Sequence, residues 1–138
     1  MQKLSSVLLV DDDETTNFLN AHLLKSLGVT DQVLLAHNGQ EALDLLAQHC
    51  APSTTTCPML VLLDINMPVM GGIEFLEAYQ PQPPAPAIHV VILTTSMHAS
   101  DLARLQALPH LTVLHKPLTR AKIDVLLQEH FHRQLAAR

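Results

Sequence analysis

The sequence predicts a doubly wound α/β domain, in which a parallel five-stranded sheet carries helices on both faces. Short apolar runs alternate along the chain with segments whose apolar residues recur at helical spacing. The apolar runs are nearly continuous, as expected for strands that are buried on both sides. A repeated strand–helix order favours parallel strands, because each helix returns the chain to the same edge of the sheet.

The five expected strands are short apolar runs of four or five residues. They are SVLLV (6–10), VLLA (33–36), MLVLL (59–63), HVVIL (89–93) and LTVLH (111–115). We expect the flavodoxin-like strand order 2-1-3-4-5, which places the first and third strands side by side.

The expected helices follow the strands at residues 16–27, 39–48, 72–79, 100–108 and 119–136. In the first helix the residues near helical spacing are Phe18, Leu19, His22, Leu23, Ser26 and Leu27. Gly28 is its expected C-terminal stop. Asn38, with Glu41 three residues later, resembles a capping box at the start of the second helix.

Other helix and loop signals lie in the second half of the chain. In the last helix, Ile123, Leu126, Leu127 and Phe131 are expected to share one face. The proline-rich run QPQPPAPA (80–87) is expected to be an extended surface connection, since proline fits neither a helix interior nor a central strand.

Length and charge narrow the class of protein. The 138 residues suit a single domain over 1–138. A net charge of -5 with only 8 Lys and Arg residues gives no basic surface, so nucleic acid is not an expected partner. No apolar stretch approaches the ~20 residues of a membrane span, so we expect no membrane partner and a soluble, cytoplasmic protein.

The two cysteines, Cys50 and Cys57, lie in the polar segment HCAPSTTTCP. Two cysteines do not make a disulfide framework, so we expect reduced loop thiols in preference to a bridge. Their spacing also does not match a usual zinc site.

Polar residues gather where the expected strands end. Asp11, Asp12 and Asp13 follow the first strand, Asp64 the third, Thr94 the fourth, and Lys116 the fifth. With the first and third strands adjacent, Asp11, Asp12 and Asp64 should converge in one pocket. Their mutual repulsion requires positive charge, which Lys116 and one divalent cation would balance. Oxygen ligands select Mg²⁺, Mn²⁺ or Ca²⁺ over zinc. Asp13 can be explained as a helix N-cap alone.

Four segments together are similar to a known family. VLLVDDDE, LLDINMPVMGG, VVILTTS and LHKPL occur in the order and spacing of the response regulator receiver domains of two-component signalling. The resemblance covers essentially the whole chain. It implies a CheY-like response regulator receiver. Because the sequence ends at Arg138, just after the last expected helix, we expect a stand-alone receiver without an attached output domain.

The resemblance also implies a role for each site residue. Asp64 would accept a phosphoryl group from a phosphohistidine on a sensor histidine kinase or a histidine phosphotransfer protein. Asp11, Asp12, Asp64 and the backbone carbonyl of Asn66 would bind Mg²⁺, with Mn²⁺ as the alternative ion. The hydroxyl of Thr94 and the ammonium of Lys116 would contact the phosphoryl group. Such a domain is not an enzyme in the usual sense, because it catalyses only its own phosphorylation and dephosphorylation, and it signals by binding a downstream protein.

One residue departs from the family pattern. Many receivers carry Tyr or Phe three residues before the lysine, and the ring turns inward on activation. This chain has Val113 there, and valine has no ring to rotate. Activation is therefore expected to move the segment from Thr94 to Ser100 and the helix that follows it, with little change at Val113.

A phosphatase of the haloacid dehalogenase type is the alternative. Residues 11–15, with Asp11 and Asp13, match its D-x-D-x-T motif. That family needs a further acid pair after the lysine, and only Asp124 and Glu129 remain, well inside a helix. It would also leave Asp64 unexplained.

A flavin-binding module is a second alternative, because flavodoxins share the topology. The loop after the first strand is acidic here, where a phosphate-binding loop needs glycine and hydroxyl groups. Aromatic residues that could stack on a flavin are scarce, at three Phe, one Tyr and no Trp.

Overall fold

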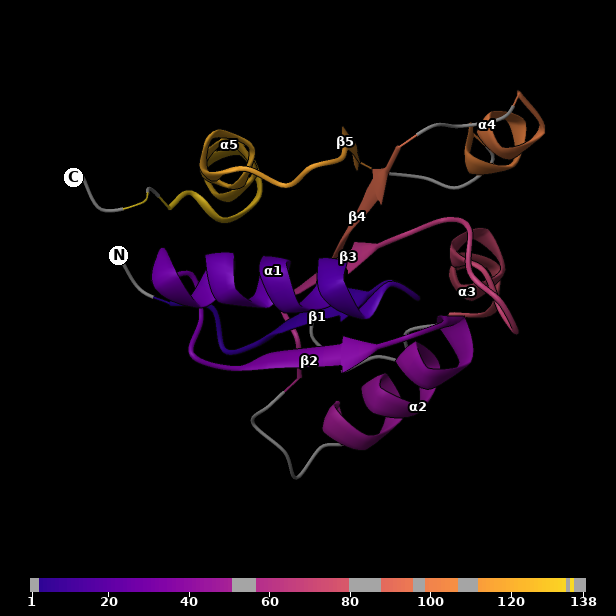
Figure 1. The fold of residues 1–138 in the computed structure, drawn as a ribbon, viewed down its shortest axis with the longest axis horizontal. Helices are drawn as coiled ribbons and strands as arrows, with labels where there is room; N and C mark the ends of the chain where they lie inside the picture. Colours follow the sequence, from indigo (N-terminus) through magenta and orange to yellow (C-terminus); the bar gives the residue numbers. More distant parts are fainter. Residues whose placement is uncertain are drawn as a thin grey trace.

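The computed structural model describes residues 3–50, 57–79, 88–95, 99–106, 112–133 and 135. Strands and helices alternate along the chain (Figure 1). The elements are β1 (Val7–Val10), α1 (Glu14–Ser26), β2 (Val33–Ala36), α2 (Gly39–His49), β3 (Leu60–Leu63), α3 (Gly72–Ala78), β4 (His89–Thr94), α4 (Ala99–Gln106), β5 (Thr112–His115) and α5 (Arg120–Phe131). The predicted alternation is confirmed, with most ends within two residues of expectation.

The sheet is parallel throughout and has the strand order β2-β1-β3-β4-β5. The predicted topology is therefore confirmed. β1 lies between β2 and β3, and its last residue, Val10, pairs with Ala36 on one side and Leu63 on the other. All carboxyl ends of the strands meet at one edge of the sheet, the carboxyl edge.

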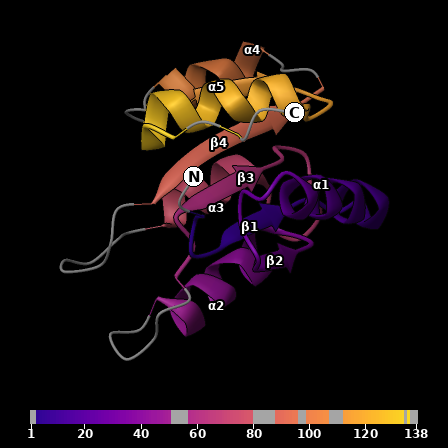
Figure 2. The same ribbon diagram turned by 90° about the vertical axis from the view of Figure 1, so that its left-hand side faces the viewer.

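Helices cover both faces of the sheet, with α1 and α5 on one face and α2, α3 and α4 on the other (Figures 1 and 2). The side chains of β1 explain this layering, because successive residues point to opposite faces. Val7 and Leu9 pack in the cluster with residues of α1 and α5, whereas Leu8 and Val10 pack with residues of α2 and α3. All four are buried, as a strand covered on both faces requires.

The expected apolar face of α1 is wrong in part. Phe18 and Leu19 are 68% and 58% exposed, and the buried residues of the helix are Asn17 and Leu24. The spacing of Phe18 and Leu19 fitted a helix, but periodicity alone does not say which stripe faces the sheet when a polar residue can be satisfied inside. Asn17 is satisfied in part, by hydrogen bonds to two strand-end carbonyls.

The last helix ends earlier than expected, at Phe131 and not at Ala136. His132 adopts a left-handed conformation with φ 54°, and its N–H bonds back to the carbonyl of Leu127. This is a usual way for a helix to end. The expected face is confirmed, since Ile123, Leu126 and Leu127 are buried and Phe131 packs against the same cluster. Gly28, with φ 74°, likewise confirms the stop after α1.

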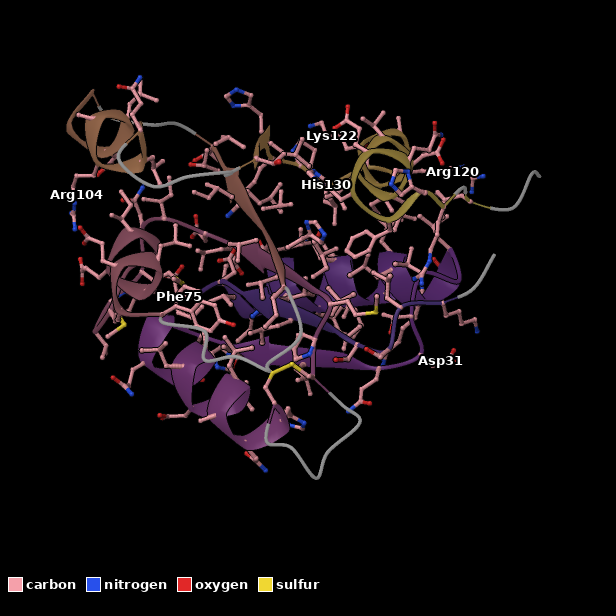
Figure 3. All side chains as sticks on the ribbon, turned by 180° about the vertical axis from the view of Figure 1, so that it is seen from behind. Asp31, Phe75, Arg104, Arg120, Lys122 and His130 are labelled. Atoms are coloured by element: carbon pink, nitrogen blue, oxygen red, sulfur yellow. A yellow bond between two sulfur atoms is a disulfide. The ribbon has the colours of Figure 1, made fainter. Side chains whose placement is uncertain are left out.

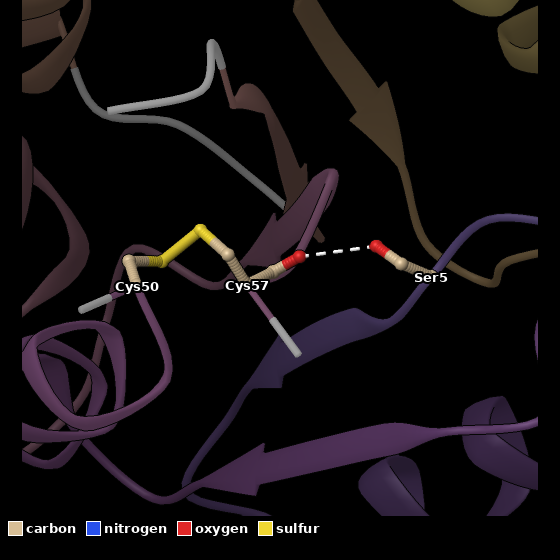
Figure 4. The surroundings of a disulfide bond; sticks show 3 residues. All are labelled: Ser5, Cys50 and Cys57. Carbon is tan, nitrogen blue, oxygen red and sulfur yellow. Dashed lines mark hydrogen bonds between the residues drawn. A yellow bond between two sulfur atoms is a disulfide. The ribbon is translucent and has the colours of Figure 1, made fainter. Parts of the chain in front are cut away.

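The expectation for the cysteines is wrong, because Cys50 and Cys57 form a disulfide (Figure 4). Cys50 caps the C-terminus of α2, and Cys57 leads into β3. The carbonyl of Cys57 also accepts a hydrogen bond from the hydroxyl of Ser5, at 3.1 Å. The chain separation predicted only a loop, whereas the return of α2 to the sheet brings the two side chains together.

Two further expectations concern the chain outside this core. The proline-rich run 80–87 lies outside the described residues. Among the helices of the described residues, none has the length and apolar character needed to cross a membrane.

Candidate functional site

The acidic residues meet at the carboxyl edge because of the strand register. Val10 pairs with Leu63, so the next residue on each chain, Asp11 and Asp64, stands beside the other. The N–H of Asp64 donates to the carbonyl of Val10 at 2.9 Å. Asp12 joins them, and ligand oxygens of the three carboxylates lie within 4.8 Å of one another. The predicted convergence is therefore present in the structure.

Burial differs among the three acids. Asp11 and Asp64 are 5% and 9% exposed, whereas Asp12 faces solvent. A buried carboxylate needs hydrogen bonds and opposite charge. Asp11 accepts from the N–H of Asp13 at 2.9 Å, and Asp64 accepts from the N–H of Ile65 at 2.9 Å. The backbone therefore holds each buried carboxylate by one oxygen.

Lys116 supplies the positive charge at the site. It follows β5, and its N–H donates to the carbonyl of Thr94 at 2.8 Å. Its Nζ lies 2.7 Å from Asp11 and 3.6 Å from Asp64. One lysine thus contacts two of the three acids directly, and the three carboxylates retain an excess of negative charge.

The excess negative charge affects the pKa values of Asp64 and Lys116. Burial, and after it the charge of Asp11, raises the pKa of the Asp64 carboxyl above its ordinary value, although Lys116 and the Ile65 N–H act in the opposite direction. Burial alone would lower the pKa of Lys116, but its hydrogen bond with Asp11 and the charges of Asp64 and Asp11 raise it. The lysine is therefore held cationic, and the Asp64 carboxylate is destabilised.

The loop from β3 to α3 packs tightly against Asp64. The N–H of Gly72 donates to the carbonyl of Ile65 at 2.9 Å. A Cβ at Gly72 would lie 2.2 Å from the carbonyl oxygen of Asp64, so only glycine fits this close approach.

The same loop contains a strained turn. The N–H of Met70 donates to the carbonyl of Pro68 at 2.7 Å, which makes a three-residue γ-turn centred on Val69. Val69 has φ 68°, which is unusual for a β-branched residue, and it is 82% exposed. The carbonyl of Met70 accepts from the N–H of Gly39 at 2.7 Å, so the N-terminus of α2 fixes the far side of the turn.

Two further predicted residues lie at the same edge. Thr94 ends β4 and is 1% exposed. Asn66 follows Asp64 by two residues and is exposed in the loop. The sheet therefore brings Thr94 and Asn66 to the edge that carries the acids.

The donor set fits a hard divalent cation. The three converging groups are all carboxylates, and Mg²⁺ prefers oxygen ligands. The excess negative charge beside Lys116 is also of the sign that a cation would neutralise. Asp11, Asp12 and Asp64 are thus the described residues that could hold Mg²⁺, with Asn66 close by in the chain.

Comparison with known proteins decides the family. The model of the response regulator receiver domain matches residues 7–128. The chain belongs to the response regulator receiver domain family. It is a CheY-like domain of two-component signalling, and the predicted family is confirmed. Members of this family bind Mg²⁺ at an acidic cluster such as the one described above.

Individual relatives agree with this assignment. A probable chemotaxis protein CheY from Rhizobium etli is 31% identical over 125 residues, which cover 91% of each chain. The response regulator Rcp1 from Synechocystis is 31% identical over 96 residues, 70% of this chain and 65% of the relative. A two-component response regulator structure from Cytophaga hutchinsonii has a TM-score of 0.77 and 27% identity, covering 96% of this chain and all of that one. The expected absence of an attached output domain stays a prediction.

The haloacid dehalogenase alternative requires Asp13 beside Asp11 in the site, and the structure does not place it there. Asp13 is exposed and serves as the N-cap of α1, accepting from the N–H groups of Thr15 and Thr16. Its pKa is lowered by these two backbone hydrogen bonds, with that to Thr16 the larger cause. The prediction that Asp13 caps a helix is therefore confirmed, and its carboxylate lies outside the acidic cluster.

Sequence reasoning missed one polar residue behind the site. Asn17 is 2% exposed, and its amide nitrogen donates to the carbonyls of Asp11 and Ala36. A polar residue where α1 should face the sheet was the only available signal, and the apolar residues Phe18 and Leu19 beside it hid that signal.

Proposed function

We propose that this receiver domain takes a phosphoryl group onto Asp64 and uses the change to switch its protein contacts. The donor would be a phosphohistidine on a sensor kinase or a histidine phosphotransfer protein, as the family implies. In the transfer the bond from phosphorus to the histidine nitrogen breaks, and a bond from phosphorus to a carboxylate oxygen of Asp64 forms.

The observation that carries the proposal is the acid cluster, in which Lys116 balances only part of the charge of three carboxylates. Asp64 is buried beside Asp11, and Lys116 reaches both. Phosphoryl transfer requires an aligned nucleophile and positive charge around the transferred oxygens, and little covalent work from the protein. Asp64 is the candidate nucleophile, and Lys116 is the candidate cation at the phosphoryl oxygens.

Mg²⁺, when bound, would neutralise the acids and the incoming phosphoryl oxygens. We assign its protein ligands to Asp11, Asp12, Asp64 and the Asn66 carbonyl. Thr94 would contact the phosphoryl group through its hydroxyl. Because these groups serve only transfer to and from Asp64, we propose no separate substrate and no further enzymatic activity.

Partners follow from the family. Receiver domains interact with histidine kinases and with downstream effectors. We propose that this chain does the same in the cytoplasm, where such kinases present their phosphohistidine. Output would pass through protein contacts, with the α4–β5–α5 face as the expected surface.

Asp64→Asn tests the acceptor. The amide is nearly isosteric with the carboxyl but a poor nucleophile, so labelling by acetyl phosphate should disappear while the fold remains. Asp31→Asn is the matched control, since Asp31 is an exposed acid paired with Lys3. Full labelling of Asp64→Asn, mapped elsewhere by mass spectrometry, would contradict the assignment.

Asp12→Ala tests the metal site. The affinity for Mg²⁺ should fall, because one of the three converging carboxylates is lost. Asp13→Ala is the control: it removes the N-cap of α1, at about 1 kcal/mol of stability, and should leave the affinity unchanged. Equal affinities in Asp12→Ala and the wild type would remove Asp12 from the ligand set.

Val113 shapes the expected response to phosphorylation. It lies in β5 and is 39% exposed, and it has no ring that could turn inward. We propose that beryllofluoride binding shifts NMR signals from Thr94 to Ser100 and in α4, and changes those of Val113 little. Large changes confined to β5 would contradict this expectation.

A further inference from the structure

The amide of Asn17 has a defined orientation. Its nitrogen donates to the carbonyl of Asp11 at 3.0 Å and to that of Ala36 at 3.3 Å. Two carbonyl oxygens can only accept, so they fix which end of the amide is the nitrogen. Asn17 therefore joins the segment after β1 to the end of β2, directly behind Asp11.

The other end of the same amide is buried without a donor. Among the described residues, none donates a hydrogen bond to Asn17 Oδ1. Buried polar atoms in folded proteins nearly always have a partner, and ordered water is the usual one when the protein supplies none.

A small cavity of about 10 Å³ lies at this place. Its polar lining consists of Asp11, Asn17, Asn20 and Asp64, over the strand residues Leu62 and Leu93. One water molecule needs about 10 to 15 Å³ and two to four polar partners. The size and the lining therefore match a single water between the Asn17 amide and the acceptor carboxylate.

Asp11 is held at several points that meet here. Asn17 binds its carbonyl, Lys116 one carboxylate oxygen, and the N–H of Asp13 the other. The N–H of Asp11 also donates to the carbonyl of Ala36, at 3.1 Å. Asn17 therefore supports the backbone at the end of β1 together with β2, from the side of α1.

We propose that Asn17 is a positioning residue for the acceptor pocket, through its hydrogen bond to the backbone of Asp11 and through one buried water that it shares with Asp64. This inference rests on the proposed function, because it assigns Asn17 to the support of the same metal and phosphoryl site. It adds a residue of α1 that contacts neither the metal nor the phosphoryl group directly.

The first experiment examines the water in the wild-type protein without metal. The side-chain amide protons of Asn17 are assigned by NMR, and their contacts to a long-lived water are measured. A cross-peak to water supports the proposal. Its absence, with the amide signals of Asn17 clearly resolved, overturns the shared-water part.

The second experiment compares Mg²⁺ and beryllofluoride binding in the wild type, Asn17→Leu and Asn17→Asp. Leucine keeps the volume and removes both hydrogen-bonding ends, whereas aspartate removes the donors to Asp11 and Ala36. Loss of a residue that supports a metal ligand typically weakens metal binding about tenfold or more. We therefore expect at least tenfold weaker Mg²⁺ binding in Asn17→Leu, measured on folded protein by titration. The loss in Asn17→Asp should be smaller, because its added negative charge attracts the cation.

Thr30→Val is the matched control for stability. Thr30 is fully buried and donates to the carbonyl of Leu4, but it lies at the opposite edge of the sheet. It should lower the melting temperature and leave Mg²⁺ affinity unchanged. Unchanged affinity in Asn17→Leu overturns the positioning role. Failure of the wild type itself to bind Mg²⁺ and beryllofluoride would instead reject the proposed function.

Discussion

The polar groups at the two edges of the sheet differ in how well they are satisfied. At the amino edge, the buried hydroxyl of Thr30 donates to Leu4 and accepts from the N–H of Gln32. The disulfide of Cys50 and Cys57 lies near the same edge. At the carboxyl edge, the Asp64 carboxylate is destabilised and Val69 sits in a strained conformation. The polar groups described at the start of the strands are thus hydrogen-bonded or bridged, whereas excess negative charge and a strained residue lie where the strands end, as expected when a site is built for a ligand.

The largest expected effect comes from filling the close contact at the carboxyl edge. Gly72→Ala places a Cβ 2.2 Å from the carbonyl oxygen of Asp64, and overpacking against backbone should cost about 3 kcal/mol. Urea denaturation measures the loss. Gly28→Ala is the control. Its added Cβ would meet no atom within 4 Å, so the cost is only that of holding alanine at φ 74°, about 1 kcal/mol. Equal losses in both variants would mean that the Asp64 contact is easily relieved.

The second effect belongs to the amino edge. Replacing both Cys50 and Cys57 by serine should lower the free energy of unfolding by roughly 2.5 kcal/mol, the chain-entropy value for so short a loop. Wild-type protein treated with dithiothreitol should show the same loss. Mg²⁺ affinity should not change in either case. A large change in Mg²⁺ affinity would contradict the claim that the disulfide at the amino edge acts independently of the site at the carboxyl edge.

The third effect is a dependence of stability on pH. Because the folded pKa of Asp64 is raised, the fold favours its protonated form. Its contribution to stability is therefore greatest below the ordinary pKa of 3.8 and is lost as the pH rises through the higher folded value. The gain in free energy of unfolding on Asp64→Asn should thus grow as the pH rises above the ordinary carboxyl pKa of 3.8.

Asp31→Asn supplies the comparison for this titration. Asp31 is an exposed acid paired with Lys3, so Asp31→Asn removes one carboxylate without touching the acid cluster. Parallel curves for Asp31→Asn and Asp64→Asn would show that Asp64 is not destabilised in the metal-free fold.

The smallest expected effect is at the strained turn. Val69→Gly should raise the free energy of unfolding by about 0.5 kcal/mol, since glycine accepts φ 68° and gives up only part of that gain in chain entropy. Val125→Gly, at an exposed position of α5, should instead destabilise the protein by a similar amount. A destabilised Val69→Gly would mean that the exposed valine makes contacts that stabilise the fold.

The sequence predicted the features that depend on neighbours along the chain. Continuous apolar runs marked the strands, and the acids at their ends marked the site, because parallel strands bring their ends together. It did not predict contacts that depend on how helices return to the sheet. The Cys50–Cys57 bridge and the inward position of Asn17 are of this kind. In α1 the rule that apolar residues are buried failed, because two strand-end carbonyls provide acceptors for an amide.

The register between β1 and β3 brings Asp11 and Asp64 together only because both strands have the same number of residues before their acid. Each strand runs four residues, from Val7 to Val10 and from Leu60 to Leu63, and the next residue is the acid. Exchanging one apolar residue for another within these strands leaves that count intact. Deleting a single residue from either strand turns its acid toward the opposite face of the sheet. The two strands should therefore tolerate many different residues, while their length up to Asp11 and Asp64 has no freedom to vary.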